Sequence, residues 1–375
     1  MKTPTITAFF ISFFSFNVSY SQCCGGGSGS PVAGGTSQGV LGERQIEIST
    51  SYQYAHTEKF FKGDSPAGDS IQVFSGSNLK GFSSKYNYFR LGYGVTKDFT
   101  MSVESGYYFD KRQIRSDSIK ESSSGIGDLI IFPRYDIYNK TKEDKSTEIT
   151  LGMGWKIPIG KYNDSLMQTV PGVLPNTLDT FYITLPPSVQ PATGSHDFIF
   201  YTFLYRGYPL KNFRVFANGM YVKKGWTPLG EKFGDYASIG LFAGKTFFKA
   251  LGITLQVKGE WMDKAKLVLY ASPNFNPEET GNKKVLIVPQ LSYNYKKFTV
   301  YALSEFPVYQ YVNKTQLASQ YQFSVGMSYR FYILPKSIIP KVGETVYECP
   351  MKCEGSISKE PGKCKMCGMD LIKQK

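Results

Sequence analysis

Four cysteines near the C-terminus are the residues of this chain whose type and spacing best suit chemistry. They form two pairs, Cys349-x3-Cys353 and Cys364-x2-Cys367, with ten residues between the pairs. Thiolates spaced in this way can surround one tetrahedral ion, and their soft sulfur atoms favour Zn(II) or Cu(I). Roughly 25 residues cannot bury a stable core unaided, so either a bound metal or a pair of disulfides is expected to staple this segment.

The residues around these cysteines resemble the short heavy-metal-binding domain found beside copper and zinc efflux components. The shared motifs are Tyr-x-Cys-Pro-Met, then Pro-Gly-x-Cys and Cys-Gly-Met-Asp-Leu, all between positions 347 and 371. The resemblance implies one heavy-metal ion as cofactor, Zn(II) or Cu(I), and periplasmic metal-efflux components as partners. Lys352 stands where the family often has His, and a protonated lysine has no lone pair to donate, so Cys353 would supply the missing ligand. Three thioethers are accessory ligands or packing groups: Met351, Met366 and Met369.

Other kinds of chemistry find little support in the composition. The 375 residues include only two histidines, His56 and His196, and neither lies in a nucleophile motif, so we expect no enzyme. The net charge of +13 comes from scattered Lys and Arg without a recognition motif, which argues against nucleic acid as a partner. We expect this scattered basic surface to meet anionic lipid or anionic solutes instead.

The N-terminus predicts export from the cytoplasm. A short basic start, an apolar run over 6–18 and small residues before Gln22 are typical of a secretory signal over 1–21. Cleavage is expected after Ser21, although a lipoprotein signal ending at Cys23 is an alternative. Residues 22–43 are rich in glycine and predict a flexible leader.

The chain between 44 and 331 breaks into about twelve short segments of period two, which is the strand pattern. The segments run to about ten or eleven residues, the length that a tilted strand needs to cross a bilayer. Short and long connections alternate between them. A soluble sandwich also alternates, but strand length, connection pattern and even number together predict an all-β transmembrane antiparallel barrel. A linker over 332–345 and a periplasmic four-cysteine module over 346–375 would follow.

Two features qualify the strand assignment. Pro133, Pro289 and Pro307 fall inside predicted strands, where proline removes a ladder donor and usually marks a bulge. The segment 198–205 is apolar on both faces, so its orientation is open and the strand count could be ten or fourteen.

Charged residues on the polar faces are expected to line the lumen, because Arg or Lys facing lipid near the midplane would cost ~2–4 kcal/mol. The two interpretations are a mixed-charge channel and a salt-bridge network that fills a narrow lumen. The candidates are Glu47, Glu104, Asp128, Arg134, Asp136, Lys156, Lys258, Glu260 and Arg330.

Two further resemblances concern the barrel. Two segments are similar to an outer-membrane channel family linked to phenol-degradation pathways: GIGDLIIFPRYDIY at 125–138 and LGMGWKIPIGKY at 151–162. Ser324-x-Gly326-x-x-Tyr329-x-Phe331 resembles the C-terminal signal by which outer-membrane barrels engage their assembly machinery. They imply a transporter-like barrel in the bacterial outer membrane, with outer-membrane lipid and the barrel-assembly machinery as partners.

The leading hypothesis is therefore an outer-membrane β-barrel with a periplasmic soft-metal-binding tail, serving copper or zinc transport or homeostasis. The alternative is a general or hydrophobic-solute channel whose cysteine tail is only a structural zinc or disulfide knob.

Overall fold

The structure is a computed structural model. It describes residues 39–67, 79–115, 120–142, 144–171, 178–248, 250–268, 276–333, 345–351, 356–364 and 368–374. The predicted signal peptide, most of the leader and most of the linker lie outside these residues, as do Cys23, Cys353, Met366 and Cys367.

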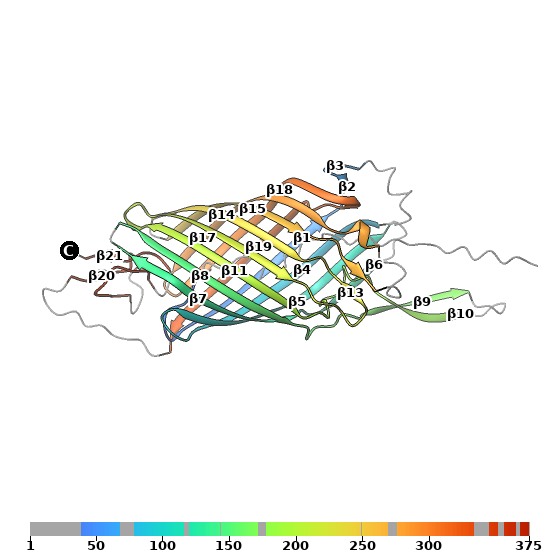
Figure 1. Ribbon diagram of the computed structural model, residues 1–375, viewed down its shortest axis with the longest axis horizontal. Coiled ribbons are helices and arrows are strands. Elements are labelled where there is room, and N and C mark those ends of the chain that lie inside the picture. Colours follow the sequence, from blue (N-terminus) through green and yellow to red (C-terminus); the bar gives the residue numbers. More distant parts are fainter. Residues whose placement is uncertain are drawn as a thin grey trace, which may run out of the picture.

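Twelve antiparallel strands close into a barrel, which confirms the predicted fold class (Figure 1). Each strand pairs with the next wall strand along the chain, and the last pairs with the first, so the sheet has no open edge. The wall strands are β1 (Gln45–Thr57), β4 (Leu79–Gly94), β5 (Phe99–Arg115), β7 (Leu129–Thr141), β8 (Ser146–Ile157), β11 (Asp197–Tyr208), β12 (Phe213–Lys223), β14 (Tyr236–Phe247), β15 (Leu251–Met262), β17 (Asn282–Tyr295), β18 (Phe298–Leu317) and β19 (Tyr321–Tyr332).

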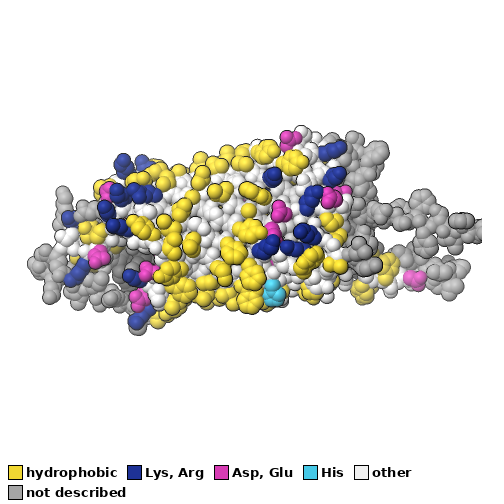
Figure 2. Space-filling model, in the orientation of Figure 1, with side chains coloured by type: hydrophobic (Ala, Val, Ile, Leu, Met, Phe, Trp, Pro, Cys, Tyr) yellow, Lys and Arg dark blue, Asp and Glu magenta, His cyan; other side chains and the backbone are white. Residues whose placement is uncertain are grey.

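The period-two pattern sorts side chains between the two faces of the wall. In β1, Glu47 and Ser49 are buried inside the barrel, whereas Ile48 and Tyr52 are 51% and 40% exposed on its outer face. Figure 2 shows hydrophobic side chains across the middle of the visible face and charged side chains toward its two ends. An apolar outer band between charged rims is the surface that a lipid bilayer requires of a barrel.

The two ends of the barrel differ. Short turns join β4 to β5, β7 to β8, β11 to β12, β14 to β15 and β17 to β18 at one end, where the C-terminal tail also lies (Figure 1). The longer connections lie at the opposite end. They carry small elements: β2 (Phe60–Gly63), β3 (Ser65–Pro66), β6 (Lys120–Ile126), β9 (Ser165–Pro171), β10 (Leu178–Thr184), β13 (Glu231–Lys232), β16 (Lys266–Leu267) and the 3-10 turn η2 (Pro277–Glu279). The described residues contain no helix that is long and apolar enough to cross a membrane.

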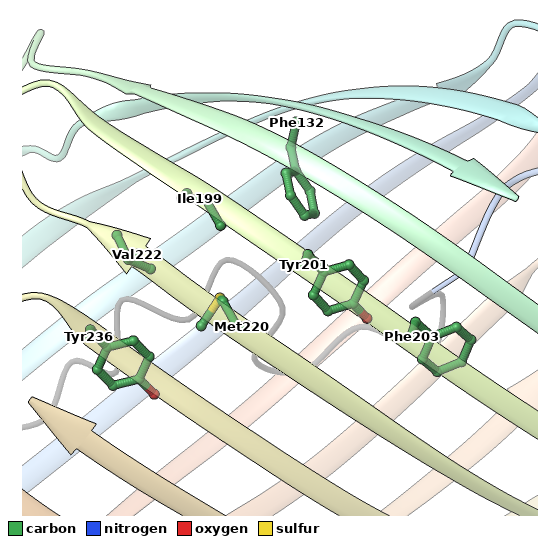
Figure 3. Close-up of a cluster of buried hydrophobic side chains, with 7 residues drawn as sticks. All are labelled: Phe132, Ile199, Tyr201, Phe203, Met220, Val222 and Tyr236. Atoms are coloured by element: carbon green, nitrogen blue, oxygen red, sulfur yellow. The ribbon is translucent and has the colours of Figure 1, made fainter. Parts of the chain in front are cut away.

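The doubly apolar segment of β11 places one face in the lumen. Ile199, Tyr201 and Phe203 point inward with Asp197, whereas Phe198 and Phe200 are each 47% exposed outside. The inward side chains join an apolar cluster that occupies part of the interior (Figure 3). Its buried members are Phe132, Ile199, Tyr201, Phe203, Met220, Val222 and Tyr236.

Of the three predicted proline bulges, the one at Pro307 is present, whereas the ladders run through Pro133 and Pro289 without a shift in register. The register between β17 and β18 shifts where Val285 pairs with Tyr309 and Leu286 pairs with Pro307, so one extra residue of β18 lies at the shift. Proline has no N–H to donate to the neighbouring strand, so a bulge is favoured at this position.

Candidate functional site

The C-terminal tail folds on itself through short backbone contacts. β20 (Tyr347–Glu348) pairs with β21 (Ile372–Lys373), and Tyr347 also forms a two-way bridge with Ser358. A tight turn follows Cys364: the N–H of Gly368 donates to the Cys364 carbonyl at 2.7 Å, and Gly368 has a φ of +73°. Glycine adopts this left-handed conformation without strain, which suits Gly368 to the turn.

The fold brings two of the four predicted metal ligands together. Cys349 and Cys364 are each 1% exposed and lie in one buried cluster, against which Met351 and Met369 pack. The N–H of Met351 points at the Cys349 sulfur, 3.4 Å away, a donor that stabilises a thiolate. The two cysteines are not joined to each other by a disulfide. Among the residues that the structure describes, no group of three or more His, Cys, Asp or Glu surrounds one point, and Cys353 and Cys367 lie outside those residues.

The tail is docked at the short-turn end of the barrel. The Lys363 ammonium forms an ion pair with Glu148 of β8 and lies over the ring of Tyr205 of β11, 3.2 Å from its centroid. Tyr332 at the end of β19 packs against the cysteine cluster. Both partners of the ion pair are largely shielded, with 21% of the lysine and 6% of the glutamate side chain exposed. Charge and ring contacts to β8 and β11 therefore hold the tail across the mouth.

Asp370 completes the docked contact. Its carboxylate accepts a hydrogen bond from the Tyr205 hydroxyl, and Gly207 leaves room for it, since an added Cβ there would lie 2.8 Å from a carboxylate oxygen. Burial raises the pKa of Asp370 to about 6, although Lys363 and Arg214 act in the opposite direction.

The nine residues predicted to line the lumen lie inside the barrel with shielded side chains. Three of them make hydrogen bonds: Glu104 to the Ser102 hydroxyl, Arg134 to the Gly39 carbonyl and Asp136 to the Thr150 hydroxyl. The others form ion pairs: Glu47, Asp128, Lys156, Lys258, Glu260 and Arg330. This pairing favours a network that fills much of the lumen over an open mixed-charge channel.

Glu47 carries the ion pairs at the seam that closes the barrel. Its carboxylate, 1% exposed, binds Arg90 of β4 on one side and Arg330 of β19 on the other. Glu47→Gln would leave two buried guanidinium groups without their shared counter-charge, at a cost of about 3–5 kcal/mol. We expect a clearly lower urea midpoint for unfolding in detergent. Glu43→Gln, at a pair 3.9 Å long with 55% of the glutamate exposed, is the matched control, and equal midpoints for the two variants would contradict the expectation.

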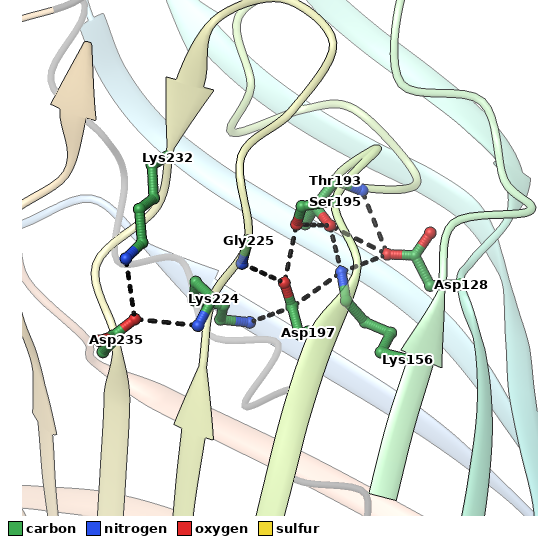
Figure 4. Close-up of polar contacts among 9 residues, drawn as sticks. All are labelled: Asp128, Lys156, Thr193, Ser195, Asp197, Lys224, Gly225, Lys232 and Asp235. Atoms are coloured by element: carbon green, nitrogen blue, oxygen red, sulfur yellow. Dashed lines mark hydrogen bonds and ion pairs between the residues drawn. The ribbon is translucent and has the colours of Figure 1, made fainter.

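A second network lies at the end with the long connections (Figure 4). Lys156 is 2.7 Å from an oxygen of Asp128 and 2.9 Å from an oxygen of Asp197, which also binds Lys224 at 3.1 Å. Ser195, from the connection between β8 and β11, donates to Asp197 at 2.8 Å. The network therefore ties the end of this long connection into the barrel.

A third network joins the neighbouring strands β14, β15, β17 and β18. Lys258 lies 2.9 Å from Glu260 and 2.8 Å from Glu305, and Lys284 lies 3.2 Å from the second oxygen of Glu260. The Tyr236 hydroxyl donates to Glu260 at 2.8 Å.

Several members of these networks were not predicted from the sequence. Arg90, Lys284 and Glu305 lie inside, and the inward parity of Tyr301 and Leu303 was the signal that could have found Glu305. Asp197 gave no such signal because β11 is apolar on both faces, and Lys224 gave none because it lies just beyond the end of β12.

A buried acid outside the barrel wall, Glu231, is expected to make the local stability of the protein depend on pH. Glu231 of β13 is 4% exposed and forms no ion pair with any residue that the structure describes, and burial raises its pKa from 4.5 to about 7. The two-stranded sheet of β13 and β16, which joins two separate long connections, therefore favours the protonated acid. Its stability is full below about pH 4.5 and falls by about 3 kcal/mol as pH rises to about 7. Hydrogen exchange, corrected for intrinsic rates, should show this loss of protection between pH 5 and 8. Glu231→Gln should remove the dependence, and an unchanged pH profile in that variant would contradict it.

Comparison with known proteins agrees with both parts of the chain. The Heavy metal binding domain matches residues 346–374. An outer-membrane channel from Pseudomonas putida F1 superposes with a TM-score of 0.56 at 10% identity, covering 79% of this chain and 99% of that one, which shows a shared fold. The β domain of the Bordetella autotransporter BrkA (TM-score 0.41, 8% identity, 77% and 100% covered) and the translocator domain of NalP from Neisseria meningitidis (0.40, 10%, 77% and 89%) are more distant. No curated protein matches the chain.

Proposed function

We propose that this chain is a bacterial outer-membrane β-barrel whose periplasmic tail binds one soft-metal ion, Zn(II) or Cu(I), in heavy-metal transport or homeostasis. The observation that carries the proposal is the meeting of Cys349 and Cys364 in one buried cluster of the segment that matches the Heavy metal binding domain. Cys353 and Cys367 would complete a tetrahedral thiolate set, and such an ion would staple a tail too short to bury its own core. Met351 and Met369 lie close enough to pack beside it.

The orientation of the barrel supports a periplasmic tail. Short turns face the periplasm in outer-membrane barrels, and the tail lies at the short-turn end. The apolar outer band would contact outer-membrane lipid. We further propose that residues 1–21 are removed as a signal peptide and that the barrel-assembly machinery recognises the segment 324–331. The partners of the tail would be periplasmic metal-efflux components.

A second candidate function is a general or hydrophobic-solute channel with a structural tail. The apolar cluster inside the lumen favours it, because apolar walls suit apolar solutes better than hydrated ions. In this case the four cysteines would hold zinc, or form disulfides, only to keep the tail folded.

Elemental analysis of the purified full-length protein, with and without reductant, tests the proposal. We expect close to one zinc or copper ion per reduced chain, and none after deletion of residues 336–375. A reduced full-length protein without either metal would overturn the metal part. The deletion also separates the two candidates in cells: lost metal tolerance supports the first, whereas unchanged tolerance with altered solute uptake supports the second.

A further inference from the structure

A cavity of about 300 Å³ lies in the lumen near the end with the long connections. The connection between β8 and β11 covers it, because Val189, Gln190 and Ala192 fold inward and are at most 4% exposed. Aromatic and charged side chains share its wall, among them Tyr86, Tyr108, Lys111, Tyr236 and Tyr321. Enclosed cavities in which apolar surface lies beside polar groups that can fix an orientation are typical of small-molecule sites.

The lysines on this wall differ in their partners. Lys156, Lys224 and Lys284 each lie within 3.2 Å of a carboxylate oxygen. Lys111 donates to the Gln190 carbonyl at 2.8 Å, and in the described part of the protein no carboxylate lies within ion-pair distance of it. An ammonium has three donors, so Lys111 keeps capacity for an anionic acceptor in a partly desolvated place.

A tyrosine ring lies against the same ammonium, and a second tyrosine ring packs on the first. Lys111 lies 4.9 Å from the centroid of the Tyr108 ring, and the Tyr86 and Tyr108 centroids are 4.4 Å apart. Gly106 makes this arrangement possible, since an added Cβ there would lie 2.3 Å from the Tyr86 hydroxyl. The rings offer an apolar surface directly beside the positive charge.

We propose that this cavity binds a small organic monoanion with an apolar body, its carboxylate on Lys111 and its body against Tyr86 and Tyr108. Asp128 also faces the cavity, but its charge is held by Lys156 at 2.7 Å. The site is separate from the tail, so it stands whether or not the tail binds metal.

Binding of benzoate and of its neutral counterpart benzamide to the full-length protein in detergent tests the site. Benzoate is expected to bind at least tenfold more tightly than benzamide, because only its carboxylate can pair with Lys111. Lys111→Gln should weaken benzoate binding at least tenfold and leave benzamide unchanged. Lys140→Gln, which removes the same charge from an exposed position outside the cavity, should bind as the wild type does.

Equal affinities for benzoate and benzamide in the wild-type protein would overturn the proposal, and this comparison needs no variant to fold. Benzoate binding that survives Lys111→Gln would overturn it too. Acetate, which carries the charge without the ring, should bind at least tenfold more weakly than benzoate, and equal binding would contradict the role of the tyrosines. Lys111→Arg keeps the charge and is expected to retain binding.

Discussion

Replacing Cys364 with serine is expected to lower the affinity of the full-length chain for a soft-metal ion by about 100-fold or more. The thiol is 1% exposed and shares a buried cluster with Cys349, so it is held where a ligand is needed. Structural zinc sites contribute about 10–16 kcal/mol over four ligands; one thiolate then accounts for ~3 kcal/mol, or about 100-fold. Serine has nearly the same size but is not a thiolate at neutral pH.

Metal content of the reduced protein after equilibration with a chelator of known affinity measures this loss. Cys349→Ser should behave like Cys364→Ser, because both thiols lie in the same cluster. Replacement of Cys23 and Cys24 together is the matched control, since these thiols precede the barrel in the chain. Wild-type affinity in Cys364→Ser would show that the ligand set is wrong. Met351→Leu tests the thioether: unchanged affinity would assign Met351 to packing.

The barrel could be predicted from the sequence because its signal is local. Alternation in one strand fixes which side chains face inward, whatever the partner strand is. Glu47 and Arg330 were therefore placed in the lumen before any pairing was known, and their contact across the seam follows from barrel closure. The same alternation and the positions of the connections predicted about twelve strands, with ten or fourteen as alternatives, and the structure has twelve in the wall.

Contacts between distant segments could not be predicted in this way. The contact of Lys363 with Glu148 joins residues 215 positions apart, and no periodicity links a tail lysine to a wall glutamate. The inward turn of Tyr201 and Phe203 was also open, because a strand that is apolar on both faces carries no parity signal. Their side chains can be buried in the lumen because they pack with Phe132 and Met220 in one apolar cluster.

Reversing the charge of Lys363 is expected to release the tail from the barrel mouth. Lys363→Glu would place a second carboxylate beside Glu148, and Asp136 lies on the same side, bound to the hydroxyl of Thr150 that also contacts Glu148. The variant also loses the ammonium over the Tyr205 ring. Breaking a shielded ion pair costs about 3–5 kcal/mol, which shifts a docking equilibrium by more than about 100-fold.

Two measurements report the release. Hydrogen exchange over 346–374 should accelerate relative to the wild type, because the tail loses its protecting surface. Conductance in planar bilayers should rise, because the docked tail lies across the mouth. Lys211→Glu, in the 3-10 turn η1 (Pro209–Lys211) at the same rim, makes the same charge change away from Glu148 and should alter neither. A Lys363→Glu protein that matches the wild type in both would show that the tail is held by other contacts.

The double variant Lys363→Glu with Glu148→Lys separates loss of the pair from loss of the lysine. The swapped charges restore attraction between β8 and the tail, so tail protection should recover in large part. The ammonium then stands on the barrel wall, however, and the contact with Tyr205 is not restored in the same form. A partial recovery would therefore divide the docking free energy between ion pair and ring contact, whereas no recovery at all would assign it to the ring.

Metal content should stay at the wild-type level in all three variants, because none of them changes a cysteine. A change in metal content would show that docking and metal binding are coupled.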